Sequence, residues 1–429
     1  MSRLVADDVA LSYDVNRPAI VKNLTLDLVP GELVGVLGPN GCGKSTLVRG
    51  LSRTLPPVRG IFTLDGRNLY THVTARESAR AIGVVPQTTE IAFDFTVRET
   101  VEMGRSPYMA RSPFAALSAA DHNFVEEALE RVSMAHLSDR VVTTLSGGER
   151  QRVFVARVLA QNTNIVLLDE PTAHLDLRHQ AQILSLAHDL AHKDGRSVLA
   201  VLHDPNLAAA HCDRIVLMAD GRLVSDGPPD VVLTSDTVQQ VFGRRVWVRK
   251  HPALGHPVLM SLPELSSDTS ETDGPGQRVH VICGGGTGAA VISALWKLGY
   301  DVSAGALSVG DTDLEVAEVL EIPYSAEPPF SPLSDGVRAE AMERAYACKA
   351  AVLTDVPIAH GNVAILDDVL SLIRMGTRVF YWGSRGEFLK RDYTDGLGAE
   401  KWDEIVRVQP MDYASCDEAI TALDAFLNR

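Results

Sequence analysis

A glycine-rich loop between an apolar run and a helix-like segment is the feature that most constrains this fold. The run ELVGVLG (32–38) predicts a short buried strand, and the segment from Lys44 to about Ser52 predicts a helix. The residues between them fit the pattern G-x-x-x-x-G-K-[ST], in which glycines let backbone N–H groups surround a phosphate and a helix N-terminus faces it. The loop consists of Gly38, Pro39, Asn40, Gly41, Cys42, Gly43, Lys44, Ser45 and Thr46. We expect Lys44 to neutralise the β- and γ-phosphates of a nucleotide and Ser45 to place its hydroxyl on Mg²⁺.

Two further apolar runs end in polar residues suited to the same chemistry. NIVLLDE (164–170) and SVLAVLHD (197–204) predict strands of a parallel sheet that is covered on both faces. An acid at the end of a strand beside the phosphate loop can hold Mg²⁺, and we expect Asp169 to do so. Glu170, the next residue, can polarise an attacking water.

The segment LSGGERQ (145–151) offers a second helix N-terminus. Ser146 is a favourable N-cap, and Gly147 and Gly148 leave the backbone open to a ligand. For an isolated S-G-G, a plain capped helix without a ligand would be the favoured interpretation.

LSGGERQ resembles the signature motif of ABC transporter ATPases, and the order of motifs matches that family across about residues 1–245. The resemblance implies that Tyr13 stacks on adenine and that Gln87 senses Mg²⁺ and a transmembrane partner. It likewise implies that Asp176, in PTAHLD, is the acid of the D-loop and that His203 contacts the γ-phosphate. Asp176, His203 and Gln87 would then assist Glu170 in catalysis.

The family mechanism implies a head-to-tail homodimer. Each ATP would lie between the phosphate loop of one chain and the signature residues of the other, namely Leu145, Ser146, Gly147, Gly148, Glu149 and Gln151. The expected partners are integral membrane permease subunits and, indirectly, an extracytoplasmic substrate-binding protein. The chain would lie peripherally on the cytoplasmic face of the membrane.

The segments FTVRETVEMGRSPY (95–108) and VLHDPNLAAAHCDRIVLMADGRLVSDGPP (201–229) are similar to ATPases of iron-chelate (siderophore), haem and cobalamin importers. The ATPase does not contact the cargo, so its motifs do not identify the molecule that is transported. Two alternatives stay open: a soluble ABC ATPase acting in DNA repair or translation, and an ATPase switch controlled by a C-terminal ligand-binding domain. A compact helical segment (about 93–160) and the lack of a basic patch favour transport without nucleic acid.

The length of 429 residues predicts two domains. We expect an ABC ATPase domain at 1–250, a linker at 251–277 rich in Pro, Ser and acids, and an accessory domain at 278–429, for which regulation is one open interpretation. Residues 261–429 hold 13 Lys and Arg against 27 Asp and Glu, a net charge of −14. The five scattered cysteines predict no disulfide framework, and no run of about 18 apolar residues is present.

The accessory domain alternates predicted strands and helices, which indicates a small Rossmann-like, doubly wound α/β fold. Its first strand is followed by Gly284, Gly285, Gly286, Thr287 and Gly288. This loop is compatible with a dinucleotide or a smaller anion, and Asp311 or Asp313 could hold a ribose. A ligand-free scaffold explains the loop equally well, and the glycine run sits in an acidic domain that opposes anions.

Overall fold

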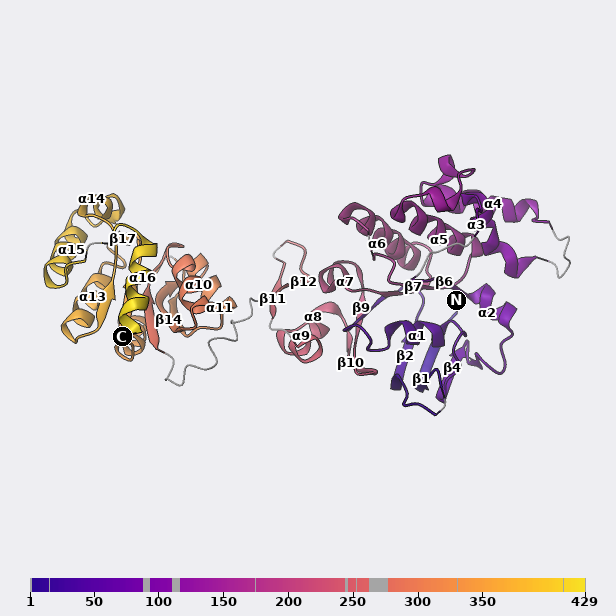
Figure 1. Cartoon of the computed structure of the whole chain (residues 1–429), viewed down its shortest axis with the longest axis horizontal. Coiled ribbons are helices and arrows are strands. Elements are labelled where there is room, and N and C mark those ends of the chain that lie inside the picture. Colours follow the sequence, from indigo (N-terminus) through magenta and orange to yellow (C-terminus); the bar gives the residue numbers. More distant parts are fainter. Residues whose placement is uncertain are drawn as a thin grey trace. The chain divides into compact units, whose positions relative to one another are not determined.

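The structure, a computed structural model, describes residues 2–428 except 15, 88–92, 110–115, 174, 244–245, 252, 262–276, 330 and 412. The chain forms two compact units, Met1–Ser261 and Leu262–Arg429 (Figure 1). Residues 262–276 of the expected linker lie outside the described part of the chain. No helix among the described residues is long and apolar enough to cross a membrane.

A six-stranded sheet forms the centre of the first unit, in the order β10-β9-β3-β8-β7-β6. Its strands are β3 (Leu33–Leu37), β6 (Ile82–Val85), β7 (Ile165–Asp169), β8 (Ser197–Val201), β9 (Arg214–Ala219) and β10 (Arg222–Gly227). All are parallel except β10, which pairs antiparallel with β9. Strands β3, β7 and β8 are buried along their whole length, and this is why each appears in the sequence as an apolar run.

A four-stranded antiparallel sheet, in the order β2-β1-β4-β5, packs on one face of the central sheet. Its strands are β1 (Leu4–Leu11), β2 (Val21–Leu28), β4 (Arg59–Leu64) and β5 (Arg67–Asn68). Alternate side chains of β1 and β2 join Val34, Val36 and Leu167 of the central sheet in one core. Helix α1 (Lys44–Leu51) contributes Leu47, Val48 and Leu51 to it.

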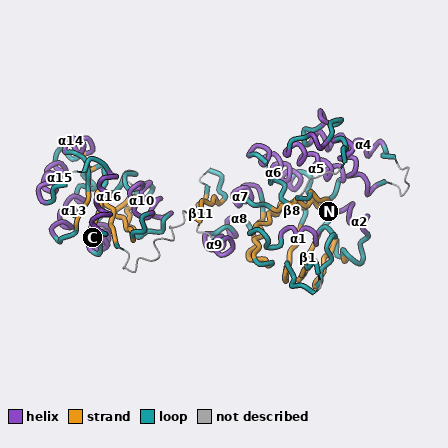
Figure 2. The backbone as a smooth tube through the Cα atoms, in the orientation of Figure 1, coloured by secondary structure: helices purple, strands orange, loops and turns teal. Residues whose placement is uncertain are grey.

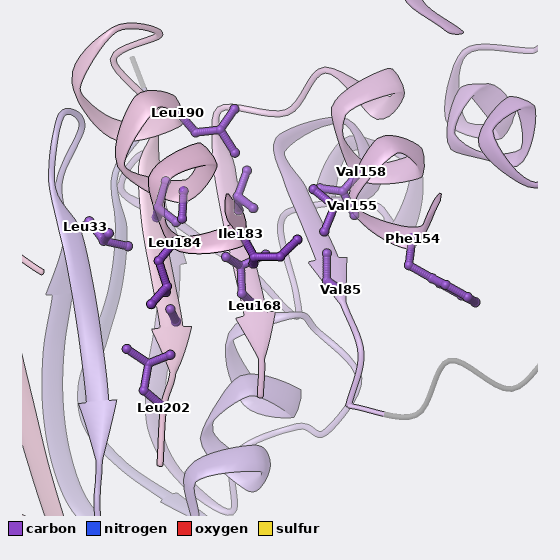
Figure 3. Packing of buried hydrophobic residues seen from close by; sticks show 14 of the residues in the cluster. Leu33, Val85, Phe154, Val155, Val158, Leu168, Ile183, Leu184, Leu190 and Leu202 are labelled. Carbon is purple, nitrogen blue, oxygen red and sulfur yellow. The ribbon is translucent and has the colours of Figure 1, made fainter. Parts of the chain in front are cut away.

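Helices cover the other face of the central sheet. They include α3 (Val97–Glu102), α4 (Ala119–Arg131), α5 (Gly147–Gln161), α6 (Leu177–His192), α7 (Pro205–His211), α8 (Pro229–Val232) and α9 (Ser235–Phe242). Figure 3 shows Ile183 and Leu184 of α6 and Val155 and Val158 of α5 directed at the strands that carry Leu168 and Val85. The two faces of the sheet therefore hold separate apolar cores.

Local capping explains where several of these helices begin. Capping boxes start α2 (Ala75–Ala81) at Thr74, α3 at Thr96, α4 at Ser118 and α5 at Ser146. The expected helical segment at about 93–160 contains α3, α4 and most of α5, together with the short 3₁₀ turns η1 (Met103–Tyr108), η2 (Ala135–Leu137) and η3 (Val142–Thr144).

A β-hairpin completes the first unit. Strands β11 (Val246–Lys250) and β12 (Pro257–Ser261) pair antiparallel, and β12 packs on α7. The amide of Asn206 in α7 accepts a hydrogen bond from the N–H of Leu259 (2.7 Å) and donates one to its carbonyl (3.1 Å). Eleven residues of the segment expected to be linker, 251–261, thus lie within the first unit.

The second unit is built on five parallel strands in the order β15-β14-β13-β16-β18. They are β13 (Arg278–Ile282), β14 (Asp301–Ser308), β15 (Tyr324–Glu327), β16 (Ala350–Leu353) and β18 (Arg378–Phe380). In chain order this arrangement is 3-2-1-4-5, so the direction of winding reverses between β13 and β16. A small parallel pair, β17 (Ile358–Ala359) and β19 (Asp392–Tyr393), lies outside the main sheet.

Helices occupy both faces of this sheet (Figure 2). The helices are α10 (Ala289–Lys297), α11 (Thr312–Val319), α12 (Asp335–Tyr346), α13 (Ala364–Arg374), α14 (Arg385–Phe388), α15 (Leu397–Val408) and α16 (Cys416–Leu427), with a 3₁₀ turn η5 (Leu389–Arg391). One core contains side chains of α10, α11 and α16, and the other contains side chains of α13 and α15. Trp402 is the largest fully buried side chain and stacks on Phe388.

Candidate functional site

The strand order of the first unit brings the sequence motifs to one edge of the sheet. The glycine-rich loop follows β3, and Gln87 follows β6. Asp169 ends β7, Glu170 comes directly after it, and His203 lies just after β8. Strands β3, β8, β7 and β6 are consecutive parallel neighbours. Their carboxyl ends therefore present these residues along a single edge, where ligands of open α/β sheets bind.

The glycine-rich loop has the backbone that its glycines allow. Gly38, Gly41 and Gly43 have φ values of 154°, 82° and 108°. A Cβ at Gly38 would lie 2.2 Å from the carbonyl oxygen of Met218, so no larger residue fits there. The ammonium of Lys44 donates to the carbonyls of Gly38 (2.7 Å) and Pro39 (3.0 Å), which holds its charge over the loop.

The thiol of Cys42 is turned into the protein. The residue is buried, and its sulfur would lie 2.8 Å from a Cβ placed at Gly38. Burial raises the pKa of this thiol, although the charge of Lys44 opposes the change. Because the thiolate is the reactive form, the raised pKa lowers the fraction of Cys42 that can react at neutral pH.

Ser45 and Asp169 form the contact expected of a pair that shares a cation. The Ser45 hydroxyl donates to Oδ1 of Asp169 at 3.1 Å. Burial raises the pKa of Asp169, and the hydrogen bond from Ser45 acts in the opposite direction. A hydroxyl and a carboxylate are hard oxygen ligands, so the donor set fits Mg²⁺.

Glu170 lies at the centre of a small polar cluster. Its Oε2 accepts a hydrogen bond from Nε2 of Gln87 at 2.7 Å and lies 2.8 Å from Nε2 of His203. The backbone of Glu170 is left-handed, with φ of 53°, a conformation that costs energy for a residue other than glycine. The structure thus brings together Glu170, Gln87 and His203, which are far apart in the sequence.

Tyr13 is half exposed and is held by helix α1. Its hydroxyl lies 3.4 Å from Oγ1 of Thr46 and accepts a hydrogen bond from the Arg49 guanidinium at 3.0 Å. The same guanidinium lies over the ring, 5.4 Å from its centroid. No motif in the sequence pointed to Arg49, although its place three residues after Thr46 puts it on the same face of the helix.

The signature segment forms a capped helix N-terminus. The Ser146 hydroxyl accepts from the N–H of Glu149 (3.3 Å), and the Glu149 carboxylate accepts from the N–H of Ser146 (2.9 Å). The hydroxyl of Ser146, followed by its N–H, lowers the pKa of Glu149. Ser146 and Gly147 are exposed, Leu145 and Gln151 are buried, and Gly148 lies against the ring of His179.

Asp176 caps helix α6 rather than contacting the cluster around Glu170. It accepts from the N–H of His179 at 2.9 Å and lies 2.7 Å from Nδ1 of the same residue. The N–H of His179 is the main cause of the lowered pKa of Asp176. His179, which also borders Gly148, therefore connects the D-loop acid to the signature helix, and no motif pointed to it.

The glycine-rich loop of the second unit differs from the expectation. The Asp311 carboxylate accepts from the N–H groups of Gly285 (2.6 Å) and Gly286 (2.9 Å). Oδ1 of Asp313 accepts hydrogen bonds from the N–H groups of Gly288 (2.9 Å) and Ala289 (2.8 Å). Internal carboxylates thus occupy the donors that were expected to bind an anion, and Asp311 faces the loop instead of a ribose.

The remaining polar groups of this loop are also engaged. The Thr287 hydroxyl donates to the carbonyl of Gly284 and lies 2.6 Å from the Thr354 hydroxyl. Asp313 is fully buried, and burial raises its pKa against the opposing effect of the Gly288 N–H. The N–H groups of Gly285, Gly286 and Gly288 are therefore paired within the chain in this structure, and a ligand site at 284–288 stays a prediction.

Comparison with known proteins agrees with this geometry. The ABC transporter family profile matches residues 21–173, and the MJ0874 family profile matches residues 302–420. The chain is 36% identical, over 98% of both chains, to the cobalamin import ATP-binding protein of Halobacterium salinarum. It is 44% identical over 56% of its length to the hemin import ATP-binding protein of Nocardia farcinica, of which it covers 82%.

Two further comparisons concern only the first part of the chain. The ferric enterobactin transport ATP-binding protein of Escherichia coli is 36% identical over 63% of this chain and 98% of its own length. A solved structure assigned to the metal-chelate type of ABC transporter, in an inward-facing conformation, superposes with a TM-score of 0.53 at 29% identity. That match covers 62% of this chain and 99% of the other.

The chain therefore belongs to the ABC transporter family, in the class of its ATP-binding subunits. More particularly, it is the ATP-binding subunit of an import system, an ATPase whose activity is coupled to transport.

Proposed function

We propose that the edge formed by β3, β8, β7 and β6 is the ATP hydrolysis site. The phosphate loop from Gly38 to Thr46 holds the triphosphate, with Lys44 on the β- and γ-phosphates. Ser45, Asp169 and Gln87 hold Mg²⁺, which stabilises the charge that develops during phosphoryl transfer. Glu170 polarises the attacking water, and the observation that carries this role is its carboxylate between Gln87 and His203.

The signature helix completes the site of a second copy in a head-to-tail homodimer. Ser146 and Gly147 are exposed at a helix N-terminus, where N–H groups and the helix dipole favour phosphate. A Cβ placed at Gly147 would meet nothing within 4 Å. The packing of this chain therefore does not require glycine there, whereas close approach of a nucleotide held by the other chain does. Asp176 and His179 lie beside this helix and connect it to the D-loop.

The cargo is a metal chelate that passes through a membrane permease after delivery by a substrate-binding protein. Among the iron-siderophore, haem and cobalamin classes, we favour a corrinoid. The relative that shares 98% of this chain, including the second unit, is named for cobalamin import. The relatives named for enterobactin and hemin match only 63% and 56% of the chain. The subunit would act on the cytoplasmic face of the membrane.

The second unit is an accessory domain with a Rossmann-like, doubly wound fold. Its strand order, with winding in both directions from β13 and helices on both faces, supports this assignment. The domain division proposed is an ATPase at 1–250, extended by the hairpin to 261, followed by a linker to 277 and the accessory domain at 278–429.

Uptake in cells tests the cargo. A strain without this chain is complemented with wild-type protein or with Glu170→Gln, and uptake of labelled cyanocobalamin, haemin and a ferric siderophore is measured. We expect corrinoid uptake to depend on wild-type protein and to be lost with Glu170→Gln. Loss of haemin or siderophore uptake with normal corrinoid uptake would overturn the cargo and leave the ATPase intact.

A further inference from the structure

A cavity of about 350 Å³ opens at the carboxyl ends of β13, β14 and β16 in the second unit. This is the edge where the winding of the sheet reverses, the usual ligand position in such sheets. Gly284, Ser308 and Val356 line it where the strands end, and Ser331, Leu333 and Ile365 line it from the surrounding loops and α13.

The cavity lacks the features that bind an anion. Its described lining residues include no Lys, Arg or His. The N–H groups of Gly285 and Gly286 already donate to Asp311, whose carboxylate is itself part of the lining. The guanidinium of Arg391, in η5, donates to the carbonyls of Thr354 and Val356 in the loop after β16. A carboxylate in a cavity without a cation disfavours phosphates and other carboxylates.

The same lining suits an uncharged molecule with hydrogen-bond donors. The walls are apolar at Leu333, Val356 and Ile365, and the hydroxyls of Ser308 and Ser331 can donate or accept. The oxygens of Asp311 are acceptors with lone pairs beyond those used by the glycine loop. A primary amide on an apolar frame matches this combination, because its NH₂ group donates and carries no charge.

We propose that this cavity binds the amide-bearing edge of a corrinoid. The proposal rests on the corrinoid cargo proposed above and extends it to a second site on the same chain. A corrinoid carries neutral carboxamide arms around its macrocycle, whereas haem carries two carboxylates that Asp311 would repel. The cavity is smaller than the macrocycle, so it takes the arms of one edge while the ring lies across its mouth.

Calorimetric titration of the full chain tests this assignment. The probes are cyanocobalamin and cobinamide, with haemin and NAD⁺ as anionic comparisons. Ser331→Trp places a bulky side chain in the cavity lining at an exposed loop position, and Ser308→Val removes a hydroxyl from the same lining. The matched control is Ala347→Trp, an exposed residue that lines a different cavity, with Arg278 and Asp301 at the opposite ends of the strands.

We expect the wild type and Ala347→Trp to bind both corrinoids, Ser331→Trp to bind them at least tenfold more weakly, and haemin and NAD⁺ not to compete. The proposal is overturned if corrinoids do not bind, if both cavity variants bind as the wild type does, or if NAD⁺ or haemin displaces them. Uptake measurements in cells distinguish failure of this proposed site from failure of the cargo assignment. Chain-dependent corrinoid uptake without corrinoid binding would refute the site alone, whereas absence of such uptake would refute the cargo.

Discussion

The carboxylate of Glu170 and the imidazole of His203 are in direct contact, with 2.8 Å between Oε2 and Nε2. The two residues follow neighbouring strands, Glu170 directly after β7 and His203 two residues after β8, so the sheet brings them close together. The left-handed backbone at Glu170 turns its side chain toward His203 and Gln87. A strained backbone at a polar cluster is a recurrent property of catalytic sites.

Replacement of Glu170 by Gln should separate ATP binding from hydrolysis. The amide keeps the shape of the side chain but cannot act as a base, so turnover should fall by about 100-fold or more. ATP affinity should stay near that of the wild type, and the homodimer should accumulate with ATP bound. Steady-state ATPase assays and size-exclusion chromatography with ATP measure both effects. Near wild-type turnover would show that another residue polarises the water.

Mixed dimers should reveal whether sites are shared between chains. Lys44→Ala removes the phosphate-loop cation, and Ser146→Arg blocks the signature helix N-terminus. A heterodimer of these two variants has one intact composite site and one site damaged on both sides. We expect each variant alone to be inactive and the mixture to recover part of the ATPase activity. A mixture as inactive as its components would contradict a shared site.

Arg49 should position Tyr13 for adenine. Loss of a cation–π contact at an exposed ring costs about 0.5–1 kcal/mol, so Arg49→Ala should weaken ATP binding about 2- to 5-fold. Binding of inorganic triphosphate, which has no base to stack, should not change. Arg59→Ala, which removes an exposed ion pair with Asp8, is the matched control. An equal loss of triphosphate binding would instead assign Arg49 to the phosphates.

The second unit should lose stability in acid through His280. This residue is buried on β13, with Nδ1 2.9 Å from the Ser303 hydroxyl. Burial, and to a smaller extent the charge of Arg344, lowers its pKa from 6.5 to about 3. Since the unfolded chain takes up the proton below pH 6.5 and the folded chain does not, stability falls with decreasing pH from 6.5 to about 3. From pH 7 to pH 5 the loss should be about 2 kcal/mol.

Denaturant unfolding of the full chain at pH 7 and pH 5 measures this effect. His280→Gln should reduce the acid sensitivity of the second unit. His360→Gln, at a side chain that is 68% exposed, should leave it unchanged. If both variants keep the full pH dependence, His280 does not cause it.

The sequence was most informative where function depends on local patterns. The ABC ATPase fold is confirmed, and the predicted strand and helix around the phosphate loop are present as β3 and α1. Contacts between distant segments were not predictable. Arg49 over Tyr13 and His179 against Gly148 depend on how strands and helices pack, and no spacing in the sequence encodes those approaches.

The loop at 284–288 shows the limit of a composition argument. A glycine run before a helix predicts free N–H donors, and this is correct only if no side chain of the same chain reaches them. Asp311 and Asp313 reach them from the start of α11, more than twenty residues later. Acidic side chains of this region thus accept hydrogen bonds from the glycine loop, in addition to giving the surface its negative charge.

The hairpin of β11 and β12 determines where the chain can be divided in the laboratory. A fragment that stops at residue 250 would keep β11 and lose β12, and so would leave an unpaired strand edge and expose the apolar groups that Leu259 covers. It would also remove both groups of Leu259 that bond the side-chain amide of Asn206. A fragment that ends at Ser261 retains all of these contacts, so the isolated ATPase should be produced with Ser261 as its last residue.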